Sequence, residues 1–172
     1  MISNNSKILG LRPIEREDLF IIQKWRNNKL IQPFVREYRE LGQKNIEKWY
    51  DSIIHNNRFE FFLIQDNSNI PIGVTGLTYI DWVNKNADIH LAIYEHDWID
   101  EIYAPEVLNI MIDYGFNHLN LHRIYAEVYE VDLKKINFLK KNKFKRDAIL
   151  REHHFYNGAY IDSHVYSILN KN

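Results

Sequence analysis

A short strand predicted over residues 87–94 carries the side chains with the most interpretable chemistry. Strand alternation places four apolar residues on one face: Ala87, Ile89, Leu91 and Ile93. The opposite, more polar face presents Asp88, His90, Ala92 and Tyr94. A carboxylate and an imidazole on one face can remove a proton from an ammonium group and leave a nucleophilic amine. Asp88 and His90 are therefore candidate catalytic residues. The alternative is a solvated or hydrogen-bonded sheet face without a catalytic role.

Hydrophobic periodicity and turn residues predict alternating strands and helices around this strand. Strands are predicted over 7–12, 59–65, 71–83, 87–94, 122–131, 144–155 and 159–169. Helices are predicted over 15–28, 45–55, 105–119 and 132–142. Asn157-Gly158 is a strong hairpin signal between the last two strands. The pattern predicts an α/β (α+β) fold with a mixed, mostly antiparallel sheet of about six to seven strands flanked by four helices.

Composition limits the classes of protein and partner. A chain of 172 residues with 45% hydrophobic content fits one domain over 1–172. With 22 Lys+Arg against 23 Asp+Glu, the chain has no global basic charge, so no nucleic-acid partner is expected. The absence of cysteine excludes disulfides, cysteine-ligated zinc and a thiol nucleophile. The start lacks the apolar run of a secretion signal and no long apolar run follows, so we expect no membrane partner and a cytoplasmic location.

Several motifs along the chain form a recognisable combination. They include Leu11-Arg12-Pro13, Trp25-Arg26-Asn27, Ile72-Gly73-Val74-Thr75-Gly76-Leu77, Leu119-Asn120-Leu121-His122-Arg123-Ile124 and Asn157-Gly158-Ala159-Tyr160-Ile161-Asp162-Ser163. From Lys7 to Leu169 the chain resembles the GNAT superfamily of N-acetyltransferases, in the branch of ribosomal-protein alanine, spermidine and amino-sugar acetyltransferases. The resemblance implies a GNAT-like fold and acetyl-CoA as co-substrate. It also implies acetyl transfer to a primary amine of a small molecule or to a peptide N-terminus, with an amino-sugar nucleotide slightly favoured.

The resemblance also suggests catalytic roles. An acidic residue at the Asp88 position often deprotonates the amine in this branch, directly or through a water. Some relatives protonate the leaving thiolate with a tyrosine in the last helix, where this chain has Leu139. A general acid would have to come from elsewhere, and Tyr129, Tyr94 and His90 are candidates.

The expected phosphate-binding loop departs from the family pattern. Trp98, Tyr103 and Glu106 align with it, but Asp100 and Ile102 stand at its two glycine positions. The resemblance implies that main-chain donors at the helix start hold the pyrophosphate, over Ile102, Tyr103, Ala104, Pro105 and Glu106. Acidic side chains beside a pyrophosphate would weaken this binding.

A second cofactor contact is implied at Asp132 and Lys135. In relatives, an asparagine at the Asp132 position lies by the pantetheine arm, and Lys135 could add positive charge near a coenzyme phosphate. The alternative for Asp132 is a helix cap, and the alternative for Lys135 is a solvated helix face.

The acceptor side offers aromatic and polar residues that could converge on the open face of the sheet. The candidate substrate-binding residues are Trp25, Arg26, Tyr38, Tyr79, Trp82 and His154. Adjacent strand residues point to opposite faces, so His153 and His154 are not expected to form a metal pair, and no metal site is predicted. The sequence leaves open a homodimer formed through the last strands.

Three functions agree with these features. The first is acetyl-CoA-dependent N-acetylation of a primary amine. The second is a binding protein on a GNAT scaffold that has lost acetyl-CoA and takes another ligand. The third is a noncatalytic interaction protein that keeps the sheet for assembly. The family resemblance favours the first, and the loop without glycines favours the other two.

Overall fold

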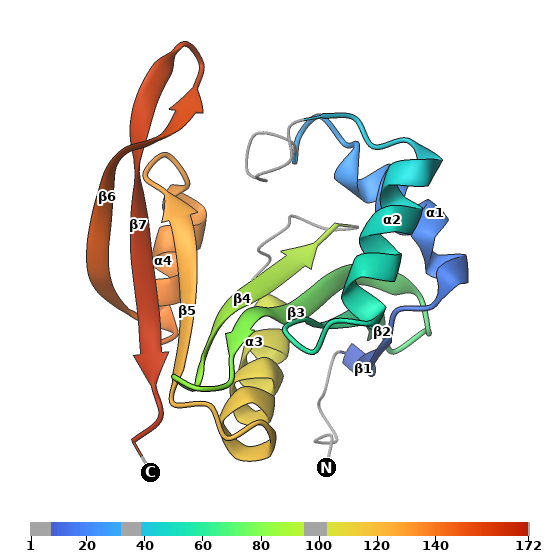
Figure 1. Cartoon of the computed structure of the whole chain (residues 1–172), viewed down its shortest axis with the longest axis horizontal. Helices are drawn as coiled ribbons and strands as arrows, with labels where there is room; N and C mark the ends of the chain where they lie inside the picture. Colours follow the sequence, from blue (N-terminus) through green and yellow to red (C-terminus); the bar gives the residue numbers. More distant parts are fainter. Residues whose placement is uncertain (1–7, 32–38, 95–102, 172) are drawn as a thin grey trace.

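The computed structural model describes residues 8–31, 39–94 and 103–171, whose strands form one seven-stranded sheet (Figure 1). The strand order is β1-β2-β3-β4-β5-β7-β6. The strands are β1 (Ile8–Pro13), β2 (Glu60–Asp66), β3 (Pro71–Asp81), β4 (Asn86–Ile93), β5 (Arg123–Tyr129), β6 (Lys145–Tyr156) and β7 (Ala159–Leu169). The α-helices in these ranges are α1 (Leu19–Arg26), α2 (Gln43–Ile54), α3 (Ala104–Asp113) and α4 (Leu133–Lys141). The predicted mixed, mostly antiparallel sheet with four helices is confirmed.

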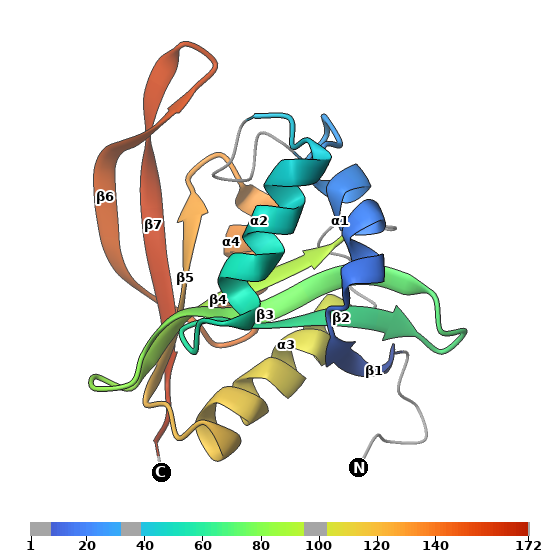
Figure 2. The ribbon, with the colours of Figure 1, turned by 45° about the vertical axis from the view of Figure 1, so that its right-hand side comes forward.

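Two apolar clusters hold the helices against the two faces of the sheet (Figure 2). Helices α3 and α4 pack in the larger cluster, and α1 and α2 pack in the second. The predicted polar face of β4 is only partly polar. Ala92 and Tyr94 are buried in the second cluster because α1 covers them, and Tyr94 stacks on Trp25 with 5.0 Å between ring centroids. None of the helices in the described ranges is long and apolar enough to cross a membrane.

Strands β4 and β5 are paired in parallel over a short stretch. The register covers only Asn86↔Arg123, Ala87↔Ile124 and Asp88↔Tyr125. Beyond these pairs the two strands diverge (Figure 1), while β4 stays paired with β3 and β5 with β7. The sheet therefore opens between β4 and β5, and Asp88 lies at the point where it opens.

The hairpin of β6 and β7 forms one end of the sheet and extends beyond its neighbours (Figure 1). Its two-residue loop is Asn157-Gly158, with φ angles of 48° and 85°. Positive φ at both positions is what a type I′ turn requires, and Asn-Gly meets it with little strain. The hairpin predicted from this dipeptide is confirmed.

Two predicted helices differ at their ends. Residues Arg16–Asp18 form a 3-10 turn before α1, closed by the amide of Glu15, which donates to Oδ2 of Asp18 at 2.8 Å. Helix α3 ends at Asp113, and Tyr114–His118 forms a π-helical turn. Gly115 in this wide turn packs against the sheet so closely that a Cβ would lie 2.7 Å from Cδ1 of Ile124. The periodicity of the sequence does not distinguish such a turn from a continuous helix.

Candidate active site

A cavity of about 610 Å³ opens where β4 and β5 diverge, on the face of the sheet that α2 covers. Its described lining comes from α1, α2, the four strands β2 to β5, the start of α4 and the segment before α2. The titratable side chains among the lining residues are Arg26, Arg39, Glu40, Tyr79, Asp88, His90, Glu127, Tyr129, Asp132 and Lys135. Acids and bases thus face one cavity, which suits proton transfer.

All three candidate catalytic residues, Asp88, His90 and Tyr129, line this cavity. Thr75 on β3 donates its hydroxyl to the carbonyl of His90 at 2.9 Å, which fixes the β4 backbone behind the cavity. The His90 ring meets Phe61 edge to face at 5.7 Å. The structure thus brings the three side chains to one cavity, and their catalytic roles stay predictions.

Only some of the candidate substrate-binding residues line the cavity. Arg26 and Tyr79 line the cavity, and Nε of Arg26 is buried without a hydrogen-bond partner among the described residues. Trp25 is only 4% exposed and packs in the core, so its indole is no open wall. Trp82 lies outside the lining and donates its Nε1 to the carbonyl of Asn57 at 3.0 Å. Tyr38 lies outside the described residues.

His154, on the terminal hairpin, contacts a residue of the cavity lining. Its ring stacks on the ring of Tyr129, with 3.9 Å between centroids and 5° between planes. His154 is not among the lining residues, so the structure places it against a cavity residue and not in the cavity.

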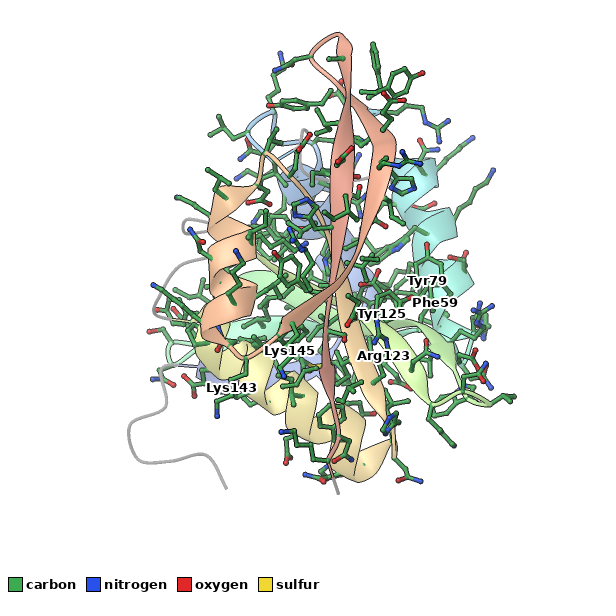
Figure 3. The ribbon with its side chains drawn as sticks, turned by 90° about the vertical axis from the view of Figure 1, so that its left-hand side faces the viewer. Phe59, Tyr79, Arg123, Tyr125, Lys143 and Lys145 are labelled. Atoms are coloured by element: carbon green, nitrogen blue, oxygen red, sulfur yellow. The ribbon has the colours of Figure 1, made fainter. Side chains whose placement is uncertain are left out.

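An aromatic wall of the cavity, contributed by α2, by β2 with the residue before it, and by β3, was not predicted as a set. Trp49, Phe59, Phe61 and Tyr79 all line it. Phe59 meets Tyr79 edge to face, with 5.4 Å between ring centroids, and the two lie side by side in Figure 3. Trp49 meets Phe61 edge to face at 5.5 Å. Only Tyr79 was singled out from the sequence, because Trp49, Phe59 and Phe61 have the spacing of ordinary core residues in a helix and a strand.

The predicted cofactor residues lie in two places. Asp132 and Lys135 line the cavity at the start of α4. Tyr103 is the N-cap of α3, and its side chain makes no capping bond there; Ala104, Pro105 and Glu106 form the first turn. The predicted helix start with Pro105 in its first turn is therefore present. Ile102 and the substituted glycine positions lie outside the described residues.

Glu127 is a cavity residue that the sequence analysis missed. It lies on β5, two positions before Tyr129, and the alternating burial of β5 puts both on the same face. Oε1 of Glu127 lies 3.0 Å from Nδ1 of His153, whose Nδ1 also lies 3.1 Å from Oγ of Ser163. The available signal was the alternation along 123–129, which groups Glu127 with the candidate Tyr129.

A β-bulge in the terminal hairpin explains how both histidines reach β5. The β6–β7 register shifts between Leu150 and His154, and Glu152 there has a φ of 50°. His153 consequently contacts Glu127 while His154 stacks on Tyr129. Simple alternation wrongly predicted that the adjacent rings would turn to opposite faces. Even so, no cluster of three or more potential metal-binding side chains occurs among the described residues.

Asp132 caps the start of α4, and burial disfavours the charged form of its side chain. Its Oδ1 accepts a hydrogen bond from the amide of Lys135 at 3.0 Å. Burial raises the pKa of Asp132 above the ordinary range, although the bond from the Lys135 amide and the charges of Lys135 and Lys134 act to lower it. A raised pKa means that the folded state holds the proton more tightly than the unfolded chain. The free energy of unfolding therefore decreases as the pH rises from the unfolded to the folded pKa.

Asp132→Asn should consequently stabilise the ligand-free protein near neutral pH by roughly 0.5–1 kcal/mol. Asparagine keeps a side-chain acceptor for the cap and carries no charge. The gain should shrink at acidic pH, where Asp132 is itself protonated. Urea unfolding of both proteins across pH measures it. Asp132→Ala is the control, because it removes the cap as well and should cost about 1 kcal/mol relative to Asn. Equal stability of wild type and Asn variant at every pH would contradict this account.

Comparison with known proteins identifies the class to which this fold belongs. The family described as "Acetyltransferase (GNAT) domain" matches residues 11–165. A spermidine N(1)-acetyltransferase of Vibrio cholerae is 31% identical over 155 residues, covering 90% of this chain and 88% of that protein. An uncharacterized N-acetyltransferase, p20 of Bacillus licheniformis, is 29% identical, covering 95% and 93%. A crystal structure of the Vibrio cholerae spermidine N-acetyltransferase in complex with CoA and spermine has a TM-score of 0.88 and 30% identity, covering 96% of each chain.

The chain belongs to the GNAT acetyltransferase family. It is an N-acetyltransferase that uses acetyl-CoA as its co-substrate. The predicted family, enzyme class and co-substrate are thereby confirmed, and the two noncatalytic alternatives are not supported.

The opened sheet offers groups of the kinds that acetyl-CoA would need. The facing edges of β4 and β5 diverge after three pairs, and such edges offer main-chain donors and acceptors to an extended chain carrying amides. Helix α3 follows β4 in the chain and packs near it, so that its positive N-terminal end suits a phosphate group. Lys135 at the cavity edge adds a cation. When bound, acetyl-CoA would supply a reactive thioester, and the surrounding residues would position the amine and handle its proton.

Proposed function

We propose that this protein acetylates a primary amine of a small polyamine. The observation that carries the proposal is the pairing of carboxylates with aromatic rings in one cavity: Asp88 and Glu127 lie with Trp49, Phe59, Phe61 and Tyr79 in its lining. Carboxylates attract ammonium groups, and aromatic faces hold cations and alkyl chains. Relatives that act on spermidine support the same acceptor class.

The sequence favoured an amino-sugar nucleotide because of Trp25-Arg26-Asn27, but two of these residues have structural partners. Trp25 stacks on Tyr94 in the core. The Asn27 amide exchanges two hydrogen bonds with the backbone of Leu41, at 2.8 and 2.9 Å. Only Arg26 of the three lines the cavity. The motif therefore supports α1 packing more than nucleotide recognition, and a polyamine becomes the better proposal.

In this proposal Asp88 accepts the proton of the acceptor ammonium, directly or through a water, at the point where β4 and β5 diverge. His90, on the same face of β4, assists in binding the amine. Tyr129, on the neighbouring strand β5, gives a proton to the departing thiolate. Asp132, Lys135 and main-chain groups at the start of α3, with Ile102, Tyr103, Ala104 and Glu106, bind the coenzyme, and Pro105 sets the helix start.

A panel of amines tests the proposal. Spermidine, spermine, an amino-sugar nucleotide and a peptide N-terminus should be compared by acetyl-CoA consumption at equal concentrations. We expect the polyamines to give the highest kcat/KM. Acetyl-CoA alone should raise the free energy of unfolding by about 2.7 kcal/mol at a hundredfold excess over its Kd. If the nucleotide or the peptide is acetylated faster than the polyamines, that compound and not a polyamine is the acceptor. The absence of turnover with every amine would contradict the proposal as a whole.

Three further predictions from the sequence are kept as proposals. We propose that residues 1–172 form one acetyltransferase domain, which the family match over 11–165 supports. We propose a homodimer in which the β6 edge pairs with a second copy, because Ile149 and Leu150 are exposed there. A dodecamer of the Vibrio cholerae relative supports self-association in general. The cytoplasmic location stays a prediction.

A further inference from the structure

The terminal hairpin reaches across β7 to a carboxylate in the cavity. His153 projects from β6, and its Nδ1 lies 3.0 Å from Oε1 of Glu127 on β5 and 3.1 Å from Oγ of Ser163 on β7. Ser163 is fully buried, and the Glu127 side chain is 14% exposed. The three groups therefore join three strands at the wall of the cavity.

The chemistry of Glu127 indicates which atom donates the hydrogen bond between Glu127 and His153. An ionised carboxylate only accepts hydrogen bonds, so Nδ1 of His153 is the donor toward Glu127. The serine and the carboxylate both contact this one nitrogen. A Ser-His-Glu nucleophilic triad needs the hydroxyl and the carboxylate on different ring nitrogens. The group is thus built to hold Glu127 in place and does not activate Ser163.

Two hydrogen bonds hold the bulge next to His153 in place. The amide of Glu152 donates to Oδ1 of Asp162 at 2.9 Å, and the amide of Asp162 donates to Oε1 of Glu130 at 3.0 Å. These two bonds fix the irregular stretch of β6 against β7 and the end of β5. The position of His153, and through it that of Glu127, is consequently defined by the backbone of the hairpin.

We propose that Glu127 determines acceptor specificity by binding a second ammonium group of the acceptor, and that His153 is its positioning residue. The inference rests on the proposed polyamine acetylation. Asp88 is paired in register with Tyr125, and Glu127 follows two residues later on the same face of β5. Two residues of a strand span about 7 Å and neighbouring strands lie about 5 Å apart, so Asp88 and Glu127 are separated by about 8 Å or more where the strands diverge. That separation suits two ammonium groups joined by a short alkyl chain, so one amine meets Asp88 while the next meets Glu127.

The experiment compares acceptors with one and with several amines. Glu127→Gln keeps the shape of the side chain and removes its charge. Its KM for spermidine should rise about tenfold or more, the loss expected for about 1.4 kcal/mol of binding. Its kcat should stay within about twofold and its KM for a simple alkyl monoamine should not change. Glu17→Gln is the matched control, since it removes the same charge from an exposed residue in the turn before α1.

Variants of His153 separate positioning from folding. His153→Asn retains a donor near the place of Nδ1 and should keep a KM for spermidine close to wild type. His153→Ala should raise that KM about threefold or more without a matching loss of kcat. These variants leave Glu127 intact, so they decide the question even if Glu127→Gln unfolds. Spermidine turnover by wild type with an unchanged KM in Glu127→Gln, or equal KM values for His153→Asn and His153→Ala, would overturn the inference. Loss of all turnover in wild type would instead refute the proposed function.

Discussion

Asp88→Asn should lower kcat for amine acetylation about 100- to 10,000-fold near neutral pH, the usual contribution of a general base. A primary alkyl amine has a pKa near that of lysine, about 10.4, so it enters the cavity protonated and cannot attack a thioester in that form. Asp88 lies in the last of the three parallel pairs, where the sheet opens onto the cavity. Asparagine fills the same space but cannot take the proton.

The pH dependence makes this expectation specific. As the pH approaches the pKa of the free amine, a growing fraction of the acceptor needs no base, so the variant should recover activity relative to wild type. Steady-state kcat from pH 6 to pH 10 measures the recovery. Acetyl-CoA binding should be unchanged, because the substitution alters none of the residues proposed to bind the coenzyme. Asp113→Asn, an exposed carboxylate on α3, is the control.

Two outcomes would assign the base elsewhere. If Asp88→Asn keeps the wild-type pH profile, Asp88 is not the base. If His90→Gln shows the loss and the alkaline recovery instead, the imidazole accepts the proton. Both residues face the same cavity from β4, so the two variants are matched in position and differ only in the group removed.

Much of the fold followed from local patterns because those patterns report burial directly. Asn157-Gly158 predicted its turn, since few other residue pairs tolerate positive φ at both positions. Asp88 and His90 followed from alternation, and β4 is regular over their stretch. Which residues on each face of a strand are buried was less predictable. Ala92 and Tyr94 share the face of Asp88 yet are buried, because a helix far away in sequence covers that end of β4.

The parts of the site that could not be predicted depend on irregular backbone and on contacts between distant segments. The bulge changes the direction in which His153 points. Glu152 has a positive φ in this bulge, but it is not the glycine that commonly marks such a position in a strand, so the sequence does not reveal the bulge. Without the bulge, nothing in the sequence links His153 to Glu127, 26 residues earlier. Trp25 and Trp82 do not line the cavity. The sequence alone does not show whether an aromatic side chain binds a ligand or packs against the rest of the protein.

Gly73→Ala should prevent stable folding, or cost more than about 4 kcal/mol, which marks an exceptional single substitution. A Cβ at Gly73 would overlap the carbonyl oxygen of Ala92 on β4 and lie 3.0 Å from Cα of Ile93. Both neighbours are backbone atoms, so no side-chain rotation relieves the overlap. The strands would have to separate along the β3–β4 pairing that supports the face carrying Asp88 and His90.

Gly10→Ala is the matched control, because a Cβ on that glycine in β1 would meet nothing within 4 Å. It should be neutral, or stabilising by about 0.5 kcal/mol through the smaller entropy of the unfolded chain. Denaturant midpoints of the two variants measure the contrast. A Gly73→Ala protein with the midpoint of wild type would show that β3 and β4 can move apart at little cost. The close approach of their backbones would then not be what holds Asp88 at the opening of the sheet.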